Sequence, residues 1–528
     1  MDMAEEAKSK LYRLKPLTDR LPAVSRPEGH VHFRTKMMWV ILILVFYFVM
    51  TNVFIYGLDQ QNTIDMFAQY RAILAGAQGS LMHLGIGPIV TGSIIMQLFV
   101  GAKIIKLDLK NEEDKAVYQS TQKFLVIIMI IVEAVPQVFG YLVPSDAFVN
   151  GMSGVFGGAG AISGLSMARF IIILQLFIGS YVVFLMDEVV SKWGIGSGVS
   201  LFIAAGVAEA IFTGTVNWHA YDPTQALSLS NPPTGTIPKT IYIIQNMSAS
   251  GLVGGGYERI LLSNPNPMVA LIGTIAIFFF VAYAESVRIE LPLAHGTARG
   301  ARGRYPIKLI YASNIPVILM AALLANVSMF SLLLYSNPGL NGIPLIGGQS
   351  WLGYYEPGSS YPSGGLAWYL STPRGLSDWL LPILSPGSYG YLAFGHGPLQ
   401  VLLHVLAYVG VMVIGSVIFA KFWIETTNMG PEAVAKQIES SGLQIPGFRR
   451  DPRVLKRVLE RYIPVVTVMS GAMVGGLAAG ADLIGTVGNA SGTGVLLAVG
   501  IMIQLYEAMG REQMMEMHPV LRGFFGGE

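Results

Sequence analysis

Long apolar runs separated by short polar segments recur along almost the whole chain. A helix crosses a bilayer with about 20 mostly apolar residues, so runs of this length predict transmembrane helices. Ten segments fit this description: 37–57, 84–102, 122–143, 168–186, 198–216, 265–285, 308–332, 398–420, 463–482 and 491–509. The pattern predicts an all-α membrane protein with ten transmembrane helices.

The segment 64–76 departs from this pattern. It is short and mildly amphipathic, it contains Arg71, and Gly79 and the LGIGP run at 84–88 follow it. A half-helix beside a glycine–proline break is tolerated at membrane depth only where protein shields it or where it lines an aqueous cavity. The pattern alone leaves two interpretations open, a surface turn and a shielded half-helix.

Positive charge is distributed very unevenly among the polar segments. With the N-terminus placed inside, all but five of the 34 Lys and Arg residues fall on the inner side. Lys and Arg concentrate in the cytoplasmic loops of membrane proteins. The sequence therefore predicts that both termini are cytoplasmic.

Five predicted helices precede the polar segment 217–264 and five follow it. An odd number places the two halves in opposite orientations, as in inverted repeats. The division that follows is a cytoplasmic N-terminal segment (1–36), an N-terminal half (37–216), an external hinge loop (217–264), a C-terminal half (265–509) with cytoplasmic loops 286–308 and 421–462 and an external loop 333–397, and a cytoplasmic tail (510–528). No strong internal sequence repeat is visible, so the two halves are inferred from topology.

Composition agrees with a membrane protein. Of the 528 residues, 52% are hydrophobic and only 12% are charged, whereas a soluble chain carries about 25% charged residues. Mean hydropathy is +0.54. The chain has no cysteine, which excludes disulfides, thiolate metal sites and a cysteine nucleophile.

Enzymatic chemistry finds no support in the sequence. There is no GxxxxGK[ST] or HExxH motif, and the glycine run at 154–160 adjoins a predicted transmembrane helix, not a soluble strand. No enzyme activity, cofactor or metal is therefore predicted. Glu133, Glu209 and Asp482 are acidic residues in or at the ends of predicted helices, where a charge is costly. Glu133 is the most informative, and it is either a structural carboxyl bonded to a neighbouring helix or a site in a proton-coupled solute carrier.

Two cytoplasmic loops are strongly basic. Loop 286–308 carries arginines on a glycine-rich turn, and loop 421–462 contains the sequence GFRRDPRVLKR. Such runs either anchor lipid headgroups or dock a large polyanion such as ribosomal RNA. Composition alone does not separate these two roles.

Five motifs resemble those of a known family: LGIGPIVTGSIIMQLFVG (84–101), DEVVSKWGIGSGVSLFIAAGV (187–207), RIELPLAHG (288–296), YPIKLIYASNIPVIL (305–319) and RYIPVVTVMSG (461–471). They closely resemble the SecY family, the large subunit of the Sec translocon, from about residue 8 to residue 520. The segment FWIETTNMGP (422–431) is similar to the archaeal type. The chain is also similar to the eukaryotic Sec channel alpha subunit.

The resemblance implies two pseudo-symmetric, inverted five-helix halves around an hourglass pore. By position, the implied pore ring is Ile86, Val90, Val199, Ile203, Ile318 and Leu497. The implied plug is the half-helix 64–76, with Met66, Phe67, Tyr70, Arg71, Ile73 and Leu74. The implied polar cluster of the lateral gate is Thr91, Glu133 and Asn326, and the implied ribosome-docking residues are Arg299, Arg302, Arg304, Arg449 and Arg450. Two ring pairs have i, i+4 spacing, which places each pair on one helix face.

The family implies a function without catalysis. A polypeptide-conducting channel would pass unfolded secretory chains across the cell membrane and release transmembrane segments sideways, between helices two/three and seven/eight. The implied partners are SecE-type (gamma) and small beta or SecG-type subunits, ribosomes, nascent chains, signal sequences and the lipid bilayer. Three positions depart from the family: Lys115 and Ala77 replace frequent arginines, and Val199 stands where Ile is frequent. A purely structural membrane scaffold would explain neither the half-helix nor the apolar ring.

Overall fold

The structure is a computed structural model. It describes residues 11–12, 21–59, 71–101, 104–105, 107, 111–156, 164–222, 225–295, 302–308, 314–336, 351–356, 359, 361–427, 429–440, 443–444, 452–488 and 490–517. In these ranges, nine helices are long and apolar enough to cross a bilayer, and one apolar helix of 15 residues is shorter. Together they correspond to the ten predicted transmembrane helices.

The helices form two sequential groups of five. The first group is α2 (Phe33–Asn52), α4 (Gly87–Gly101), α5 (Glu112–Gly140), α7 (Gly164–Trp193) and α8 (Gly198–Val216). The second group is α12 (Met268–Ser286), α13 (Ile315–Ser336), α17 (Pro398–Thr426), α19 (Pro452–Ile484) and α20 (Gly492–Met517). The short helix is α4, because the residues before Gly87 turn back toward the segment that precedes them.

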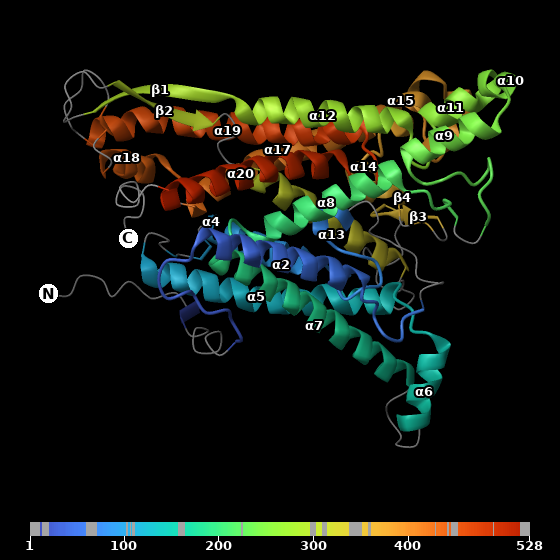
Figure 1. Cartoon of the computed structure of the whole chain (residues 1–528), viewed down its shortest axis with the longest axis horizontal. Coiled ribbons are helices and arrows are strands. Elements are labelled where there is room, and N and C mark those ends of the chain that lie inside the picture. The colour runs from blue at the N-terminus through green and yellow to red at the C-terminus, as the bar shows by residue number, and fades with distance from the viewer. Residues whose placement is uncertain are drawn as a thin grey trace.

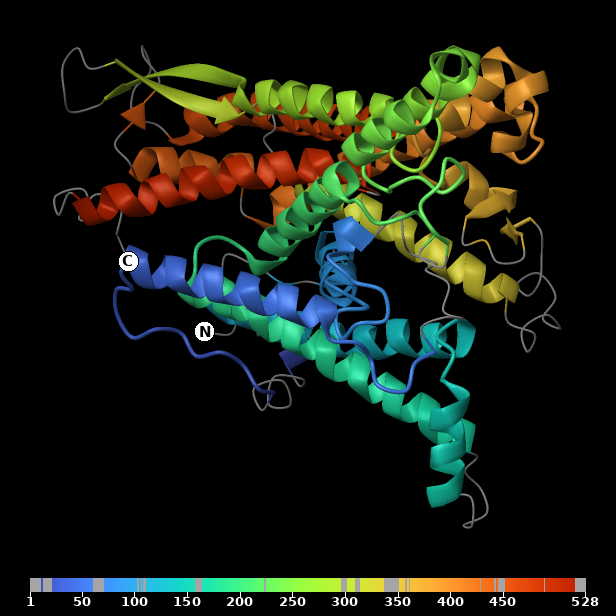
Figure 2. The ribbon, with the colours of Figure 1, turned by 45° about the vertical axis from the view of Figure 1, so that its right-hand side comes forward.

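The two groups lie as two layers. Figure 1 shows α12, α17, α19 and α20 in one layer and α2, α5 and α7 in the other, with α4, α8 and α13 between them, and Figure 2 shows the same separation. Lys36 near the start of α2 pairs with Glu512 near the end of α20, with 2.8 Å between Nζ and Oε2. The first and last helices therefore meet at one end of the bundle, called the terminal end below; the other is the loop end.

A small antiparallel sheet extends α12 at the terminal end (Figure 1). Strand β1 (Arg288–His295) pairs with β2 (Arg302–Lys308), and β5 (Leu443–Gln444) adds to the other edge of β1. The sheet was not predicted, and β2 occupies the residue at which the seventh predicted helix was expected to begin. It brings loops 286–308 and 421–462 side by side, with α18 (Pro431–Ser440) packed on α19.

The loop end holds short elements that were not predicted. They are α6 (Asp146–Phe156), α9 (Thr236–Asn246), α10 (Ala249–Gly251), a π-helical turn (Leu252–Gly256), α11 (Tyr257–Leu261), β3 (Tyr354–Tyr355), β4 (Pro362–Gly364), α14 (Gly365–Leu370), α15 (Leu376–Leu384), α16 (Pro386–Tyr389) and a 3₁₀ turn (Gly390–Ala393). Lys239 of α9 is only 2% exposed. Its Nζ donates to the carbonyls of Ser263 (2.5 Å) and Pro265 (2.9 Å), which ties α9 to the start of α12.

Helices α8 and α20 begin in the same way, which is a local sign of the predicted pseudo-symmetry. Asp187 of α7 accepts the Val199 N–H at 2.9 Å, and Asp482 of α19 accepts the Thr493 N–H at 3.0 Å. In both cases a Ser-Gly pair precedes the bonded residue, and a carboxylate of the preceding helix satisfies an N–H that the helix leaves unpaired. The last helix of each group is thus anchored by one construction.

The two groups touch backbone to backbone at the loop end. A Cβ added to Gly214 of α8 would lie 2.4 Å from the Cα of Gly488, in the turn between α19 and α20. Gly488 has φ +76°, and a Cβ there would lie 1.7 Å from the carbonyl oxygen of Ala210. Only glycine permits this approach. The two glycines bring α8 and the second group into direct backbone contact at the loop end, in addition to the packing of α8 on α20.

Candidate functional site

The six residues implied for the pore ring are all buried or half-buried in the bundle. Their backbones belong to α8, α13 and α20, to α4, and to the turn that leads into α4. The exposed fractions are 0% for Ile86, Ile203 and Leu497, 5% for Val90 and 7% for Ile318, and Val199 is half-buried. All six belong to, or pack against, one hydrophobic cluster. Apolar side chains have no fixed hydrogen-bond pattern, and an apolar constriction resists ions by dewetting. The six residues are called the apolar constriction below, after the role that the resemblance implies.

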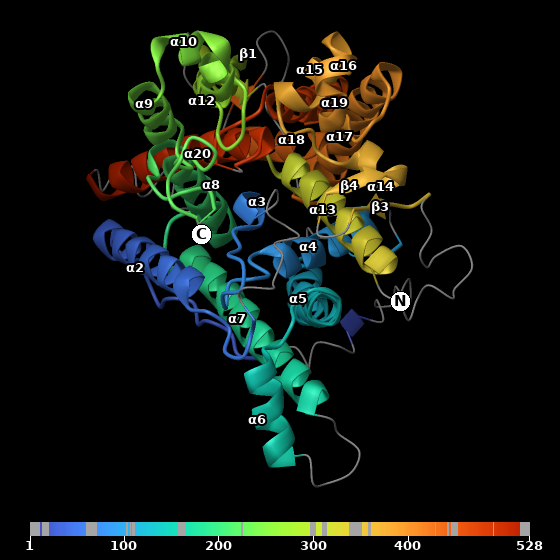
Figure 3. The ribbon, with the colours of Figure 1, turned by 90° about the vertical axis from the view of Figure 1, so that its right-hand side faces the viewer.

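A short helix, α3 (Arg71–Leu74), packs against this constriction. It contacts α8 and α20, and Figure 3 shows it near the middle of the bundle. The carbonyl of Leu74 accepts the N–H of Ile86 at 2.8 Å, so the end of α3 is bonded directly to a residue of the ring. The predicted shielded half-helix thus continues into the constriction and not into a surface turn. Of the implied plug residues, Met66, Phe67 and Tyr70 and the side chain of Ile73 lie outside the described residues.

Glycine makes this seating possible. Ala75 (φ 51°) ends α3 in the left-handed region, and Gly85 (φ +56°) turns the chain back toward α4. A Cβ on Gly85 would lie 2.1 Å from the Leu74 carbonyl oxygen. The LGIGP run, which marked an interruption in the sequence, is therefore the turn that receives the end of α3.

A hydrogen-bonded cluster joins three helices beside the constriction. Thr91 Oγ1 of α4 lies 2.9 Å from Glu133 Oε1 of α5, and Asn326 Nδ2 of α13 donates to Thr91 Oγ1 at 3.1 Å. These are the three residues implied for the gate, and the structure brings them together. Glu133 is buried and bonded across helices, which matches the interpretation as a structural carboxyl. The cluster links the first group of helices to the second.

The cluster has a second contact that sequence reasoning missed. Gln137 of α5 donates from Nε2 to the Sδ of Met329 on α13, at 3.7 Å. Gln137 follows Glu133 by four residues, so it lies on the same helix face. That spacing was the available signal. A small cavity of about 30 Å³ is lined by Glu133, Gln137 and Asn326 and also by Arg71 of the plug helix, so the plug and the helix interface adjoin.

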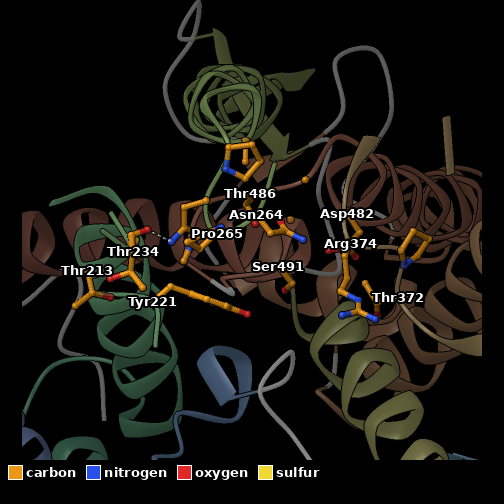
Figure 4. Close-up of a pocket in the computed structure, with 18 of the residues that line it drawn as sticks. Thr213, Tyr221, Thr234, Asn264, Pro265, Thr372, Arg374, Asp482, Thr486 and Ser491 are labelled. Atoms are coloured by element: carbon orange, nitrogen blue, oxygen red, sulfur yellow. Dashed lines mark hydrogen bonds between the residues drawn. The ribbon is translucent and has the colours of Figure 1, made fainter. Parts of the chain in front are cut away.

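The other acidic candidates have simpler surroundings. Asp482 is 2% exposed and accepts hydrogen bonds from Tyr408 Oη (2.6 Å) and Thr493 Oγ1 (2.6 Å). It lies at the edge of a polar cavity of about 460 Å³ at the loop end, shown in Figure 4 between Tyr221 and Arg374. Glu209 is exposed on α8. In the described part of the chain, no three His, Asp or Glu side chains are placed to hold a metal ion.

The implied ribosome-docking residues are only partly visible. Arg302 and Arg304 belong to β2, where they pair with Ala294 and Pro292 of β1. Their side chains, and Arg299, Arg449 and Arg450 entirely, lie outside the described residues. The backbone alone brings the two basic loops together, since Ala294 also pairs with Gln444 of β5.

Known proteins are similar to this chain in sequence and fold. The SecY family model matches residues 80–506, and the model of the plug domain of Sec61p matches residues 45–79. A protein translocase subunit SecY from Archaeoglobus fulgidus is 46% identical over 515 residues, covering 98% of each chain. A structure described as a protein conducting channel matches with TM-score 0.74 and 38% identity, covering 96% of this chain and 98% of the other. Sec61 in the canine ribosome-channel complex matches with TM-score 0.72 and 38% identity, with the same coverages.

The helical bundle, its apolar constriction and the helix packed against it define a multi-pass membrane protein built as a channel. The chain belongs to the SecY family. The predicted fold class and family are thereby confirmed.

Proposed function

We propose that the chain is the central pore-forming subunit of a Sec protein translocase, which conducts unfolded polypeptides and does not catalyse a reaction. One observation carries the proposal: a buried apolar constriction is bonded by its own backbone to a plug helix and adjoins a polar interface between the two groups of helices. The relatives named as protein translocase subunits support it.

The constriction and the interface are suited to two exits for the same polypeptide, one across the membrane and one sideways into lipid. Apolar side chains place no fixed hydrogen-bond demand on a passing chain, so they can surround an extended polypeptide of any sequence. The sideways exit lies between α4/α5 and α13/α17, where Thr91, Glu133 and Asn326 hold the interface with few hydrogen bonds. Such bonds between membrane helices average about 0.6 kcal/mol and reach about 1.7 kcal/mol. Burial of an apolar signal sequence at this interface can therefore outweigh these hydrogen bonds, and the signal sequence can then move into the lipid.

Photo-crosslinking to a stalled secretory nascent chain tests the pore. Crosslinkers at Val90, Ile203 and Ile318 should all react, because these side chains line the proposed constriction. A crosslinker at Ile414 of α17, which is 63% exposed, serves as the lipid-facing control and should not react. Absence of a crosslink from all three central positions would show that the pore is assigned wrongly.

We place the terminal end in the cytoplasm and the loop end outside the cell, from the distribution of Lys and Arg. The two basic loops are then one docking surface for the ribosome, which the neighbouring Sec61 structure supports because it belongs to a ribosome-channel complex. SecE-type and beta or SecG-type subunits complete the proposed assembly.

Charge reversal tests the docking surface. Arg302→Glu with Arg449→Glu should weaken ribosome binding and change the dependence of binding on salt, because Lys and Arg that neutralise RNA phosphates release counterions. The control is Lys436→Glu, an exposed residue of the same cytoplasmic region. Ribosome binding by the double variant equal to that of the control would assign these loops to lipid headgroups instead.

A further inference from the structure

A chain of buried polar side chains connects the plug to the helix interface. The N–H of Gly79, in the turn after the plug helix, donates to Nδ1 of His83 at 3.0 Å. His83 Nε2 lies 3.1 Å from the hydroxyl of Tyr141, and that hydroxyl donates to Oε1 of Gln137 at 2.7 Å. Gln137 in turn donates from Nε2 to the Sδ of Met329 on α13, which is the last contact of this series. His83, Tyr141 and Gln137 are 2%, 6% and 5% exposed, so none of them exchanges its partners freely with water.

The direction of these bonds is fixed by their donors. The Gly79 N–H occupies Nδ1 as an acceptor, so the imidazole hydrogen is on Nε2 and points to Tyr141. The hydroxyl hydrogen of Tyr141 then points to the carbonyl oxygen of the Gln137 amide. With that amide turned away, the Tyr141 hydroxyl loses its acceptor. Its hydrogen can then turn toward Nε2, which places the imidazole hydrogen on Nδ1 against the Gly79 N–H. The orientation of Gln137 therefore favours the bond of the plug turn.

The plug helix is held by the same residue from the other side. Arg71 donates from Nη1 to the backbone carbonyl of His83 at 2.6 Å. Arg71 and Gln137 also line the same small cavity, together with Asn326 of α13. His83 thus touches the plug helix, the turn that follows it and Tyr141, the residue that caps interface helix α5, through three different atoms.

We propose that His83 and Tyr141 are positioning residues that couple seating of the plug to closure of the interface between α5 and α13. The inference rests on the proposed channel function and names how its two closures act together. Buried polar groups are costly to leave unpaired, so loss of one bond destabilises the next. When α13 moves away from α5, Gln137 loses its contact with Met329 and can turn. The Gly79 N–H of the plug turn then loses its acceptor, Nδ1 of His83. Coupling of this kind acts equally in both directions.

The test uses the full chain in liposomes and needs no substrate. Because the chain has no cysteine, three introduced thiols are the only ones present. Ala77→Cys reports on the plug turn through its rate of labelling by a maleimide. Gly101→Cys with Phe422→Cys locks α4 to α17, since a Cβ on Gly101 would lie 3.2 Å from that of Phe422, near the separation of about 3.8 Å in disulfides.

The measured quantity is the rate at which the maleimide labels position 77 with the lock reduced, divided by the same rate with the lock oxidised. In the otherwise unchanged chain, we expect oxidation to slow labelling about fivefold to tenfold, as for one or two net hydrogen bonds. In Tyr141→Phe the ratio should approach one. His83→Phe should behave like Tyr141→Phe, whereas His83→Gln, whose amide can accept and donate, should restore the ratio.

Tyr47→Phe is the matched control. Tyr47 donates from its hydroxyl to the carbonyl of Ala75 at 3.3 Å, so it contacts the plug but not the interface. Its loss should raise labelling with and without the lock and leave the ratio unchanged. The proposal is overturned if locking has no effect on the unchanged chain, or if Tyr141→Phe keeps the full ratio. Failure of the channel function itself would instead appear in the nascent-chain crosslinks.

Discussion

Loss of Asn326 should lower the hydrophobicity that a signal sequence needs. Asn326→Ala removes the hydrogen bond from α13 to Thr91, which crosses between the two groups of helices. Hydrogen bonds between membrane helices average about 0.6 kcal/mol and reach about 1.7 kcal/mol. Opening of the interface should therefore become about 3-fold to 20-fold more favourable.

This energy can be expressed as side-chain size. Each buried methylene contributes about 0.8 kcal/mol, so one lost hydrogen bond is equivalent to about one or two methylenes of the signal sequence. The assay is translocation into vesicles of a secretory protein whose signal is shortened stepwise by Leu→Val and Leu→Ala changes. With Asn326→Ala, the signal of half-maximal translocation should be less apolar by about that amount.

The matched control is Asn246→Ala. Asn246 lies at the end of α9 and donates to the carbonyl four residues earlier, as Asn326 does, but contacts no other helix through that bond. It should leave the required hydrophobicity unchanged. An unchanged or higher requirement with Asn326→Ala would refute the view that this hydrogen bond holds the interface closed.

Three further outcomes follow from local geometry. Gly85→Ala should unseat the plug by about 1 kcal/mol or more, and ion leak from liposomes should exceed that of Gly410→Ala, whose Cβ meets open space. Burial lowers the pKa of Lys239 from 10.5 to about 8. Between these two pH values the folded chain binds fewer protons than the unfolded chain, so the thermal midpoint in detergent should rise with pH across that interval. Lys239→Met should remove this rise. Tyr408→Phe should cost about 1–3 kcal/mol of unfolding free energy by removing a donor to the buried Asp482.

The transmembrane helices were predictable because lipid imposes one demand on every spanning segment. Each must be apolar for about 20 residues and must pair its own backbone groups. The half-helix was also visible, since Arg71 and the LGIGP run interrupt that regularity. The roles of Ile86 and Ile203 were not, because a buried isoleucine at a pore and one in a core have the same pattern; only the resemblance to SecY proteins separated them.

Contacts between distant segments were beyond sequence reasoning. The pairing of β1 with β5 depends on how the helices bring loops 286–308 and 421–462 together, and no local pattern encodes it. His83 was overlooked for the same reason. A single histidine among apolar residues has no ligand spacing, and its partner Tyr141 lies 58 positions later in the chain.

The backbone contact between Gly214 and Gly488 is a natural pivot point between the two groups of helices. With no side chain between the two backbones, rotation of one group of helices about this contact meets little steric resistance. The 26 residues of α20 span about 39 Å from that point. A swing of about 15° would carry the far end through an arc of about 10 Å, the diameter of one helix. A small rotation at the loop end would thus be amplified at the terminal end into a displacement as wide as a helical signal.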